Sequence, residues 1–189
     1  MEKKKDLRVI KTQKTLFNTL LMLLKDKPFE DIKVSDICNE ALINRSTFYA
    51  HYNDKYELLV DLINNLKDSL EKALDTNKNI INTKEYYMEM INILLNHLDN
   101  ERDTYYPILL NNRNSVVLDI LLDVIDKDIE KKFHSNNLNG NVPKEIVAKF
   151  YLGAVVSIGI EWLRNNKKYT EEEIFNYLNV LIPDNINEL

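Results

Sequence analysis

Two short helical patterns separated by three residues constrain this chain more than any other feature. Residues 34–41 repeat their apolar side chains at the spacing of one helical face, and residues 45–52 place Phe48 and Tyr52 on one face of a second helix. Two helices joined by so tight a turn cross at a steep angle. The segment 32–59 therefore predicts a helix-turn-helix.

The outward face of the second predicted helix offers hydrogen-bond donors and no acidic side chain. Its residues are Arg45, Ser46, Thr47, Tyr49, Ala50 and His51. Such a face suits the major groove of DNA, because arginine can donate two hydrogen bonds to guanine, while threonine and alanine can contact a thymine methyl group. The alternative is the solvated surface of a helical bundle.

The same segment resembles the TetR (AcrR-type) family of bacterial transcriptional regulators. The resemblance rests on ALINRSTFYAHY at 41–52, followed by NDK at 53–55 and ELL at 57–59. It implies that Arg45, Thr47, Tyr49 and Ala50 face bases, and that Tyr49, His51 and Lys55 reach phosphates. It also implies a homodimer that binds double-stranded DNA and often a small molecule.

Two positions depart from the usual family pattern. Leu42 stands where the family commonly has glycine, and a non-glycine residue at positive φ costs roughly 1–2 kcal/mol, so we expect the turn to adjust and avoid that conformation. Lys33 stands where a hydroxyl residue commonly opens the helix. It loses that cap but can still meet a phosphate.

Glycine and proline are too scarce for an all-β fold. The 189 residues contain 3 Gly and 4 Pro, and long stretches repeat with helical period, so the sequence predicts an all-α chain of about nine helices. The single cysteine, Cys38, permits no internal disulfide and is expected to be a buried structural thiol rather than a redox sensor. No apolar run spans a bilayer and the start resembles no signal peptide, so we expect a cytoplasmic protein.

Charge is divided unevenly along the chain. Residues 1–60 hold 11 Lys/Arg and 9 Asp/Glu, whereas the remainder holds 14 and 21, within a net charge of −5. Phosphate binding depends on local charge, and a basic run precedes the helix-turn-helix, consisting of Lys3, Lys4, Lys5, Arg8, Lys11 and Lys14. Without the adjacent helix-turn-helix, this basic run would be interpreted as a solvated tail.

The remaining helices follow from periodicity and caps. In the first half they are expected at 6–25, with an apolar stripe beginning at Ile10, from Asp54, and at 83–98. The next follows Asn100 and contains Pro107, which should kink it or mark a new start. The last are expected at 114–133, at 143–165, and from the Thr170–Glu173 capping box. We expect a DNA-binding domain at 1–56 and a helical ligand-binding and dimerisation domain at 57–189.

Small residues in the eighth predicted helix indicate close helix approach. Gly153, Ala154, Ser157 and Gly159 lie in its middle, and glycine inside a helix costs about 1 kcal/mol unless packing uses it. Together with the last helix it is expected to form a four-helix bundle with a second subunit. Segments 151–163 and 170–173 are similar to the C-terminal region of Firmicute-type members of the same family.

The function expected from these features is a regulator, most often a repressor, released from a palindromic operator by a small-molecule effector. Aromatic residues in the second domain could line the effector cavity, and we select Tyr87, Tyr105, Tyr106 and Trp162, although core packing is the competing interpretation. The alternative function is a coactivator that works through a protein partner without an effector.

No catalytic or metal-binding constellation is visible in the sequence. The three histidines are far apart, and His97 with Glu101 is a helix-surface pair more often than a metal site. The sequence also lacks a glycine-rich phosphate loop. We therefore expect neither an enzyme nor a bound cofactor.

Overall fold

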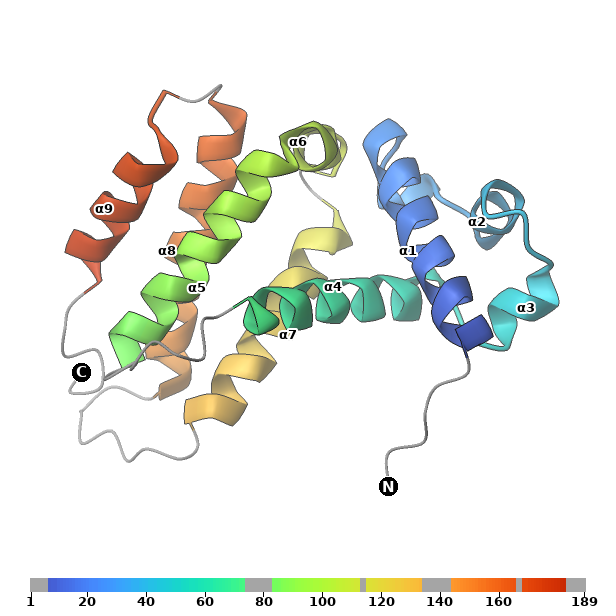
Figure 1. Cartoon of the computed structure of the whole chain (residues 1–189), viewed down its shortest axis with the longest axis horizontal. Coiled ribbons are helices and arrows are strands. Elements are labelled where there is room, and N and C mark those ends of the chain that lie inside the picture. The colour runs from blue at the N-terminus through green and yellow to red at the C-terminus, as the bar shows by residue number, and fades with distance from the viewer. Residues whose placement is uncertain (1–6, 74–82, 113–114, 134–143, 166–167, 183–189) are drawn as a thin grey trace.

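The computed structural model describes residues 7–73, 83–112, 115–133, 144–165 and 168–182. Across these residues the chain forms nine α-helices and one 3-10 helix, with no strand, which confirms the all-α prediction. The elements are α1 (Leu7–Asp26), η1 (Phe29–Asp31), α2 (Val34–Glu40), α3 (Arg45–Tyr49), α4 (Lys55–Lys72), α5 (Thr83–Asn100), α6 (Arg102–Asn111), α7 (Val116–Phe133), α8 (Lys144–Arg164) and α9 (Glu171–Leu181). Figure 1 shows α2 and α3 at one end of the molecule and α9 at the other.

The N-terminal helices share one hydrophobic core. Every one of α1 to α4, together with η1, contributes a fully buried side chain, the set being Leu16, Leu20, Phe29, Ile37, Phe48, Leu58 and Leu59. The apolar stripe of α1 begins later than predicted, because Ile10 is 44 % exposed. The helix therefore packs by its C-terminal half.

This core continues into the second half of the chain. Ile108 of α6 and Val124 of α7 belong to the same buried cluster as the helix-turn-helix. Figure 1 shows α1 beside α6, and the two helices are in contact. Apolar packing thus crosses position 56, where we expected the first domain to end.

A second core lies among α5, α8 and α9. Its buried members are Met88, Ile91, Leu95, Trp162, Leu163, Ile174, Leu178 and Ile182. Helix α8 leaves several apolar or small residues exposed, namely Ile146, Phe150, Gly153 and Ala154, and α9 leaves Tyr177, Val180 and Leu181 exposed. These surfaces are candidates for subunit contact.

Local sequence signals fix several helix ends. The Asp54 carboxylate accepts hydrogen bonds from Tyr56 N and Glu57 N at 2.8 Å each, which confirms it as the cap of α4. Thr170 and Glu173 form the predicted capping box of α9. Pro107 lies inside α6 rather than at the start of a new helix.

Membrane-spanning helices are absent from the described part of the chain, where every helix is too short or too polar for a bilayer.

Candidate nucleic-acid interface

The recognition unit consists of α2 and α3. Phe48 of α3 is fully buried and Tyr52, just beyond the helix, is 4 % exposed, so both anchor the unit in the N-terminal core. Helix α3 ends at Tyr49, three residues earlier than predicted, and Tyr52 N donates to Phe48 O at 3.0 Å in the turn that follows. Burial of one face of α3 leaves the opposite face to solvent.

The outward face of α3 gathers the predicted base-facing residues. Arg45, Ser46 and Ala50 are exposed, Tyr49 is 56 % exposed, and Thr47 is partly exposed. The Tyr49 ring meets the Phe48 ring edge to face, with centroids 5.5 Å apart, so its position is fixed by the core. His51 is half-buried beside this face.

The turn between α2 and α3 contradicts our expectation for Leu42. Leu42 has a φ of 54°, so the turn adopts the left-handed conformation instead of avoiding it. Two hydrogen bonds explain this: Leu42 N donates to Asn39 O at 3.2 Å and Ile43 N donates to Cys38 O at 3.0 Å. They form a Schellman motif, which satisfies carbonyls at the end of α2 and places Leu42 where glycine is usual.

Cys38, at the base of the same turn, is buried as predicted. Burial raises the pKa of its thiol, an effect that the charge of Arg45 partly opposes. Cys38 is therefore a packing residue of the recognition unit rather than a reactive thiolate.

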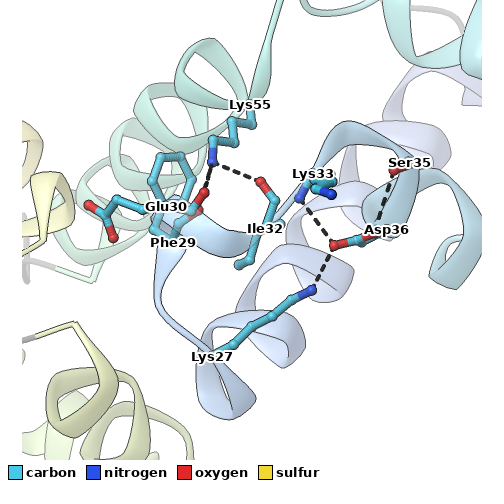
Figure 2. A network of polar contacts seen from close by, with 8 residues as sticks. All are labelled: Lys27, Phe29, Glu30, Ile32, Lys33, Ser35, Asp36 and Lys55. Atoms are coloured by element: carbon cyan, nitrogen blue, oxygen red, sulfur yellow. Dashed lines mark hydrogen bonds and ion pairs between the residues drawn. The ribbon is translucent and has the colours of Figure 1, made fainter.

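The start of α2 is held by a carboxylate that sequence reasoning missed. Asp36 accepts a hydrogen bond from Lys33 N at 3.1 Å and pairs with Lys27 Nζ at 2.6 Å (Figure 2). The hydrogen bond from Lys27 and then that from Lys33 N hold the pKa of Asp36 below its ordinary value. Asp36 thus satisfies the backbone N–H of Lys33 at the start of α2 and leaves the exposed Lys33 side chain at the edge of the recognition unit.

Lys55, the first residue of α4, points inward toward η1. Its Nζ donates to Phe29 O at 2.8 Å, Glu30 O at 2.9 Å and Ile32 O at 2.7 Å (Figure 2). Burial lowers the pKa of Lys55, while the charges of Glu30 and Asp31 act in the opposite direction. An ammonium has three N–H donors, so these carbonyls occupy all of them. Its predicted phosphate contact stays a prediction, and this geometry favours a role in holding η1.

A second polar cluster ties the recognition unit to α1 and α4. Tyr52 Oη donates to Asp61 Oδ2 at 2.6 Å, and Gln13 Nε2 lies 3.3 Å from the same carboxylate oxygen. Burial and then the hydrogen bond to Asp61 raise the pKa of Tyr52. The phenol therefore stays protonated as a donor, and the cluster joins α1 to α4 and to the turn after α3.

The basic run is described only in part. Arg8, Lys11 and Lys14 are exposed on α1, whereas Lys3, Lys4 and Lys5 lie outside the described residues. The first three contribute positive charge to the surface of the N-terminal domain.

Two of the four aromatic residues selected for effector binding, Trp162 and Tyr105, pack in the second core. Trp162 is 4 % exposed and its Nε1 donates to Tyr169 O at 2.9 Å. Tyr105 Oη lies 2.8 Å from His97 Nε2, and burial raises the pKa of Tyr105 to about 12. The Tyr106 ring centroid is 5.5 Å from the Arg102 guanidinium, and the side chain of Tyr87 lies outside what the structure describes.

An open groove of about 310 Å³ lies elsewhere, between α7 and α8. Its lining is mainly apolar and contains none of the selected aromatics, the residues being Leu118, Leu122, Gly153, Val156, Ser157, Ile160, Glu161 and Arg164. Within the described residues no group of three His, Cys, Asp or Glu side chains could hold a metal ion.

Both halves of the chain match models of known protein families. Residues 16–62 match the model described as bacterial regulatory proteins of the tetR family, and residues 85–184 match a model described as a transcriptional regulator C-terminal region. The second match alone covers more than half of the chain. The chain belongs to the TetR family of transcriptional regulators. It is a DNA-binding regulator with an N-terminal helix-turn-helix and a helical C-terminal domain, as the sequence predicted.

Two relatives within the TetR family match different shares of this chain. The dhaKLM operon transcriptional activator DhaS of Lactococcus lactis is 27 % identical over 156 residues, which cover 78 % of this chain and 76 % of DhaS. An uncharacterised HTH-type transcriptional regulator of Bacillus subtilis, YxbF, is 31 % identical over 90 residues, which cover 48 % of this chain but only 20 % of YxbF.

Among solved structures, a TetR transcriptional regulator from Streptococcus agalactiae superimposes with a TM-score of 0.64 at 23 % identity. The superposition covers 94 % of this chain and 96 % of that one. It shows that the two share a fold along nearly their whole length.

Proposed function

We propose that this TetR-family regulator reads a palindromic operator by placing the outward face of α3 in the major groove. In this proposal Arg45 contacts guanine, Thr47 and Ala50 touch thymine methyl groups, and Ser46 and Tyr49 complete the face. The observation that carries it is that these side chains point to solvent while Phe48 of the same short helix is buried.

Phosphate contacts would come from the edges of this face. Lys33 is exposed at the start of α2, and His51 and Tyr49 follow at the end of α3. Lys55 supports the same surface indirectly, since its ammonium holds η1. Such contacts fix the register of the protein on DNA without reading sequence.

Two copies are needed to read both halves of a palindrome. Half-sites one helical turn apart require recognition helices about 34–36 Å apart. The exposed small residues of α8, with the exposed apolar residues of α9, supply a surface for the second copy. We place the domain boundary after residue 56 and assign dimerisation to residues 57–189.

A small-molecule effector in the second domain would modulate operator binding in the cytoplasm. The aromatic set of Tyr87, Tyr105, Tyr106 and Trp162 is one candidate for its site, and the groove between α7 and α8 is another. An effector can shift DNA affinity only by the difference in its affinity for the two conformations. We propose repression as the outcome.

Activation is the second candidate function. The relative DhaS is named a transcriptional activator, and it matches most of this chain. A coactivator working through a protein partner would need no operator of its own. Footprinting separates a regulator with its own operator from such a coactivator. The pure protein should protect a palindromic sequence selected from genomic fragments, and no footprint at any protein concentration would favour the coactivator.

A further inference from the structure

The short connector η1 is held by two hydrogen bonds to the backbone of one buried residue, Phe29. Phe29 is fully buried, its N–H donates to Asn112 Oδ1 at 2.8 Å, and its carbonyl accepts from Lys55 Nζ at 2.8 Å. Asn112 ends α6 and Lys55 begins α4. The backbone of one residue therefore joins the second domain to the first turn of α4.

The junction between α6 and α7 holds this connector with more than one bond. Asn112 is 2 % exposed, and its Nδ2 donates to Ile108 O at 2.9 Å and Leu24 O at 3.3 Å. On the other side of the junction Val116 N, at the start of α7, donates to Glu30 Oε1 at 3.0 Å. Side-chain and backbone groups from both α6 and α7 thus converge on the end of α1 and on η1.

The opposite side of η1 leads directly into the recognition unit. Figure 2 shows Lys55 reaching the carbonyls of η1 and of Ile32, one residue before Lys33, which stands at the N-cap position of α2. The Lys27–Asp36 pair then links the first turn of α2 to the residue that follows α1. A displacement of η1 would therefore be passed to the start of α2 and to α4 together.

We propose that Glu30 and Asn112 are positioning residues for DNA binding, which couple the α6–α7 junction to the recognition unit through η1. The inference rests on the proposed function, because it concerns how α3 is presented to the operator. Neither side chain lies on the outward face of α3. They act by narrowing the range of orientations that α2 and α3 adopt relative to the second domain.

The expected effect follows from the population of the binding-competent orientation. If that orientation makes up a smaller fraction of molecules, the apparent dissociation constant for the operator rises in inverse proportion. Loss of one link between two domains should lower operator affinity by about fivefold, the lower end of typical coupling between sites. Random DNA, which imposes no spacing of two half-sites, should be bound almost as before.

Glu30 offers the sharper test because its side chain is exposed, whereas replacing the buried Asn112 endangers the fold. The three variants to compare are Glu30→Ala, Glu30→Gln and Asp31→Ala. Each loses one negative charge, so each gains the same attraction for DNA. Glu30→Gln keeps an oxygen that can accept a hydrogen bond from Val116 N. Asp31→Ala removes the charge of the next residue in the same connector and leaves Glu30 in place.

The measurement is affinity of the full-length protein for the operator and for random DNA, with thermal midpoints as the control for folding. We expect Glu30→Ala to bind the operator about fivefold more weakly than Glu30→Gln and Asp31→Ala, with similar midpoints and similar random-DNA affinity for all three. Equal operator affinity for the three variants would overturn the inference.

An Arg45→Ala variant separates this inference from the proposed function. If Arg45→Ala weakens operator binding while the three connector variants bind alike, only the coupling through η1 is wrong. If Arg45→Ala has no effect on operator binding, α3 is not the reading element and the proposed function is wrong as well.

Discussion

Leu42 carries a conformational cost that glycine would remove. Its φ of 54° lies in the left-handed region, which costs a residue with a Cβ roughly 1–2 kcal/mol. Its side chain is 92 % exposed, so truncation loses almost no apolar burial. Glycine at this position also raises the entropy of the unfolded chain, which offsets about 0.4–1 kcal/mol of the gain. Leu42→Gly should therefore stabilise the protein by about 0.5–1 kcal/mol.

Urea unfolding at one fixed protein concentration measures this change, because a dimer's stability depends on concentration. In thermal unfolding of a chain of this length, a gain of 1 kcal/mol in the free energy of unfolding corresponds to a rise of about 2–4 °C in Tm. Leu42→Ala is the matched control: it shortens the same exposed side chain but keeps the Cβ, so its stability should stay within about 0.5 kcal/mol of the parent.

Comparing Leu42→Gly with Leu42→Ala shows whether the backbone or the side chain of Leu42 causes the cost. Stabilisation by glycine but not alanine assigns the cost to the backbone of the Schellman turn. Equal stabilisation by both would mean that the exposed leucine side chain itself is unfavourable, and destabilisation by glycine would contradict the left-handed conformation of Leu42.

Three further changes test other parts of the structure. Tyr52→Phe keeps a buried ring but removes the 2.6 Å hydrogen bond to Asp61, so urea unfolding should show a loss of about 1–3 kcal/mol; an unchanged midpoint would refute the role of this bond. Because the folded pKa of Asp36 is lowered, its pair with Lys27 adds stability above the unfolded pKa of about 3.9, and this is lost as pH falls through the folded value. Asp36→Asn should thus destabilise at pH 7 and cost less below that window, and a penalty independent of pH would contradict this. Gly153→Leu should convert dimers to monomers in sedimentation experiments, since leucine blocks close helix approach; intact dimers would remove α8 from the interface.

Local patterns were sufficient to predict much of this fold. The caps at Asp54 and Thr170 and the inward positions of Phe48 and Ile37 depend on neighbours within a few residues, so periodicity and side-chain type identified them. The left-handed Leu42 was missed because the sequence shows the cost of the conformation but not the two hydrogen bonds that compensate for it.

Long-range polar contacts were beyond such reasoning. Asn112 lies 83 residues from its partner Phe29, and nothing in the sequence around either residue indicates the pairing. Lys55 was expected at a phosphate because the resemblance to the TetR family implied that contact. Its actual surroundings depend on η1, whose carbonyls reach it only once α1 and α4 have packed.

Arg45→Ala tests the central claim, that the outward face of α3 reads DNA sequence. The measurement is the affinity of parent and variant for the selected operator and for random DNA at the same salt concentration. Arg45 is placed to contact base edges, so its loss should cost roughly 1–3 kcal/mol on the operator and much less on random DNA, which lowers discrimination. An operator affinity unchanged by the substitution, or an equal loss on both DNAs, would contradict the claim that Arg45 reads bases.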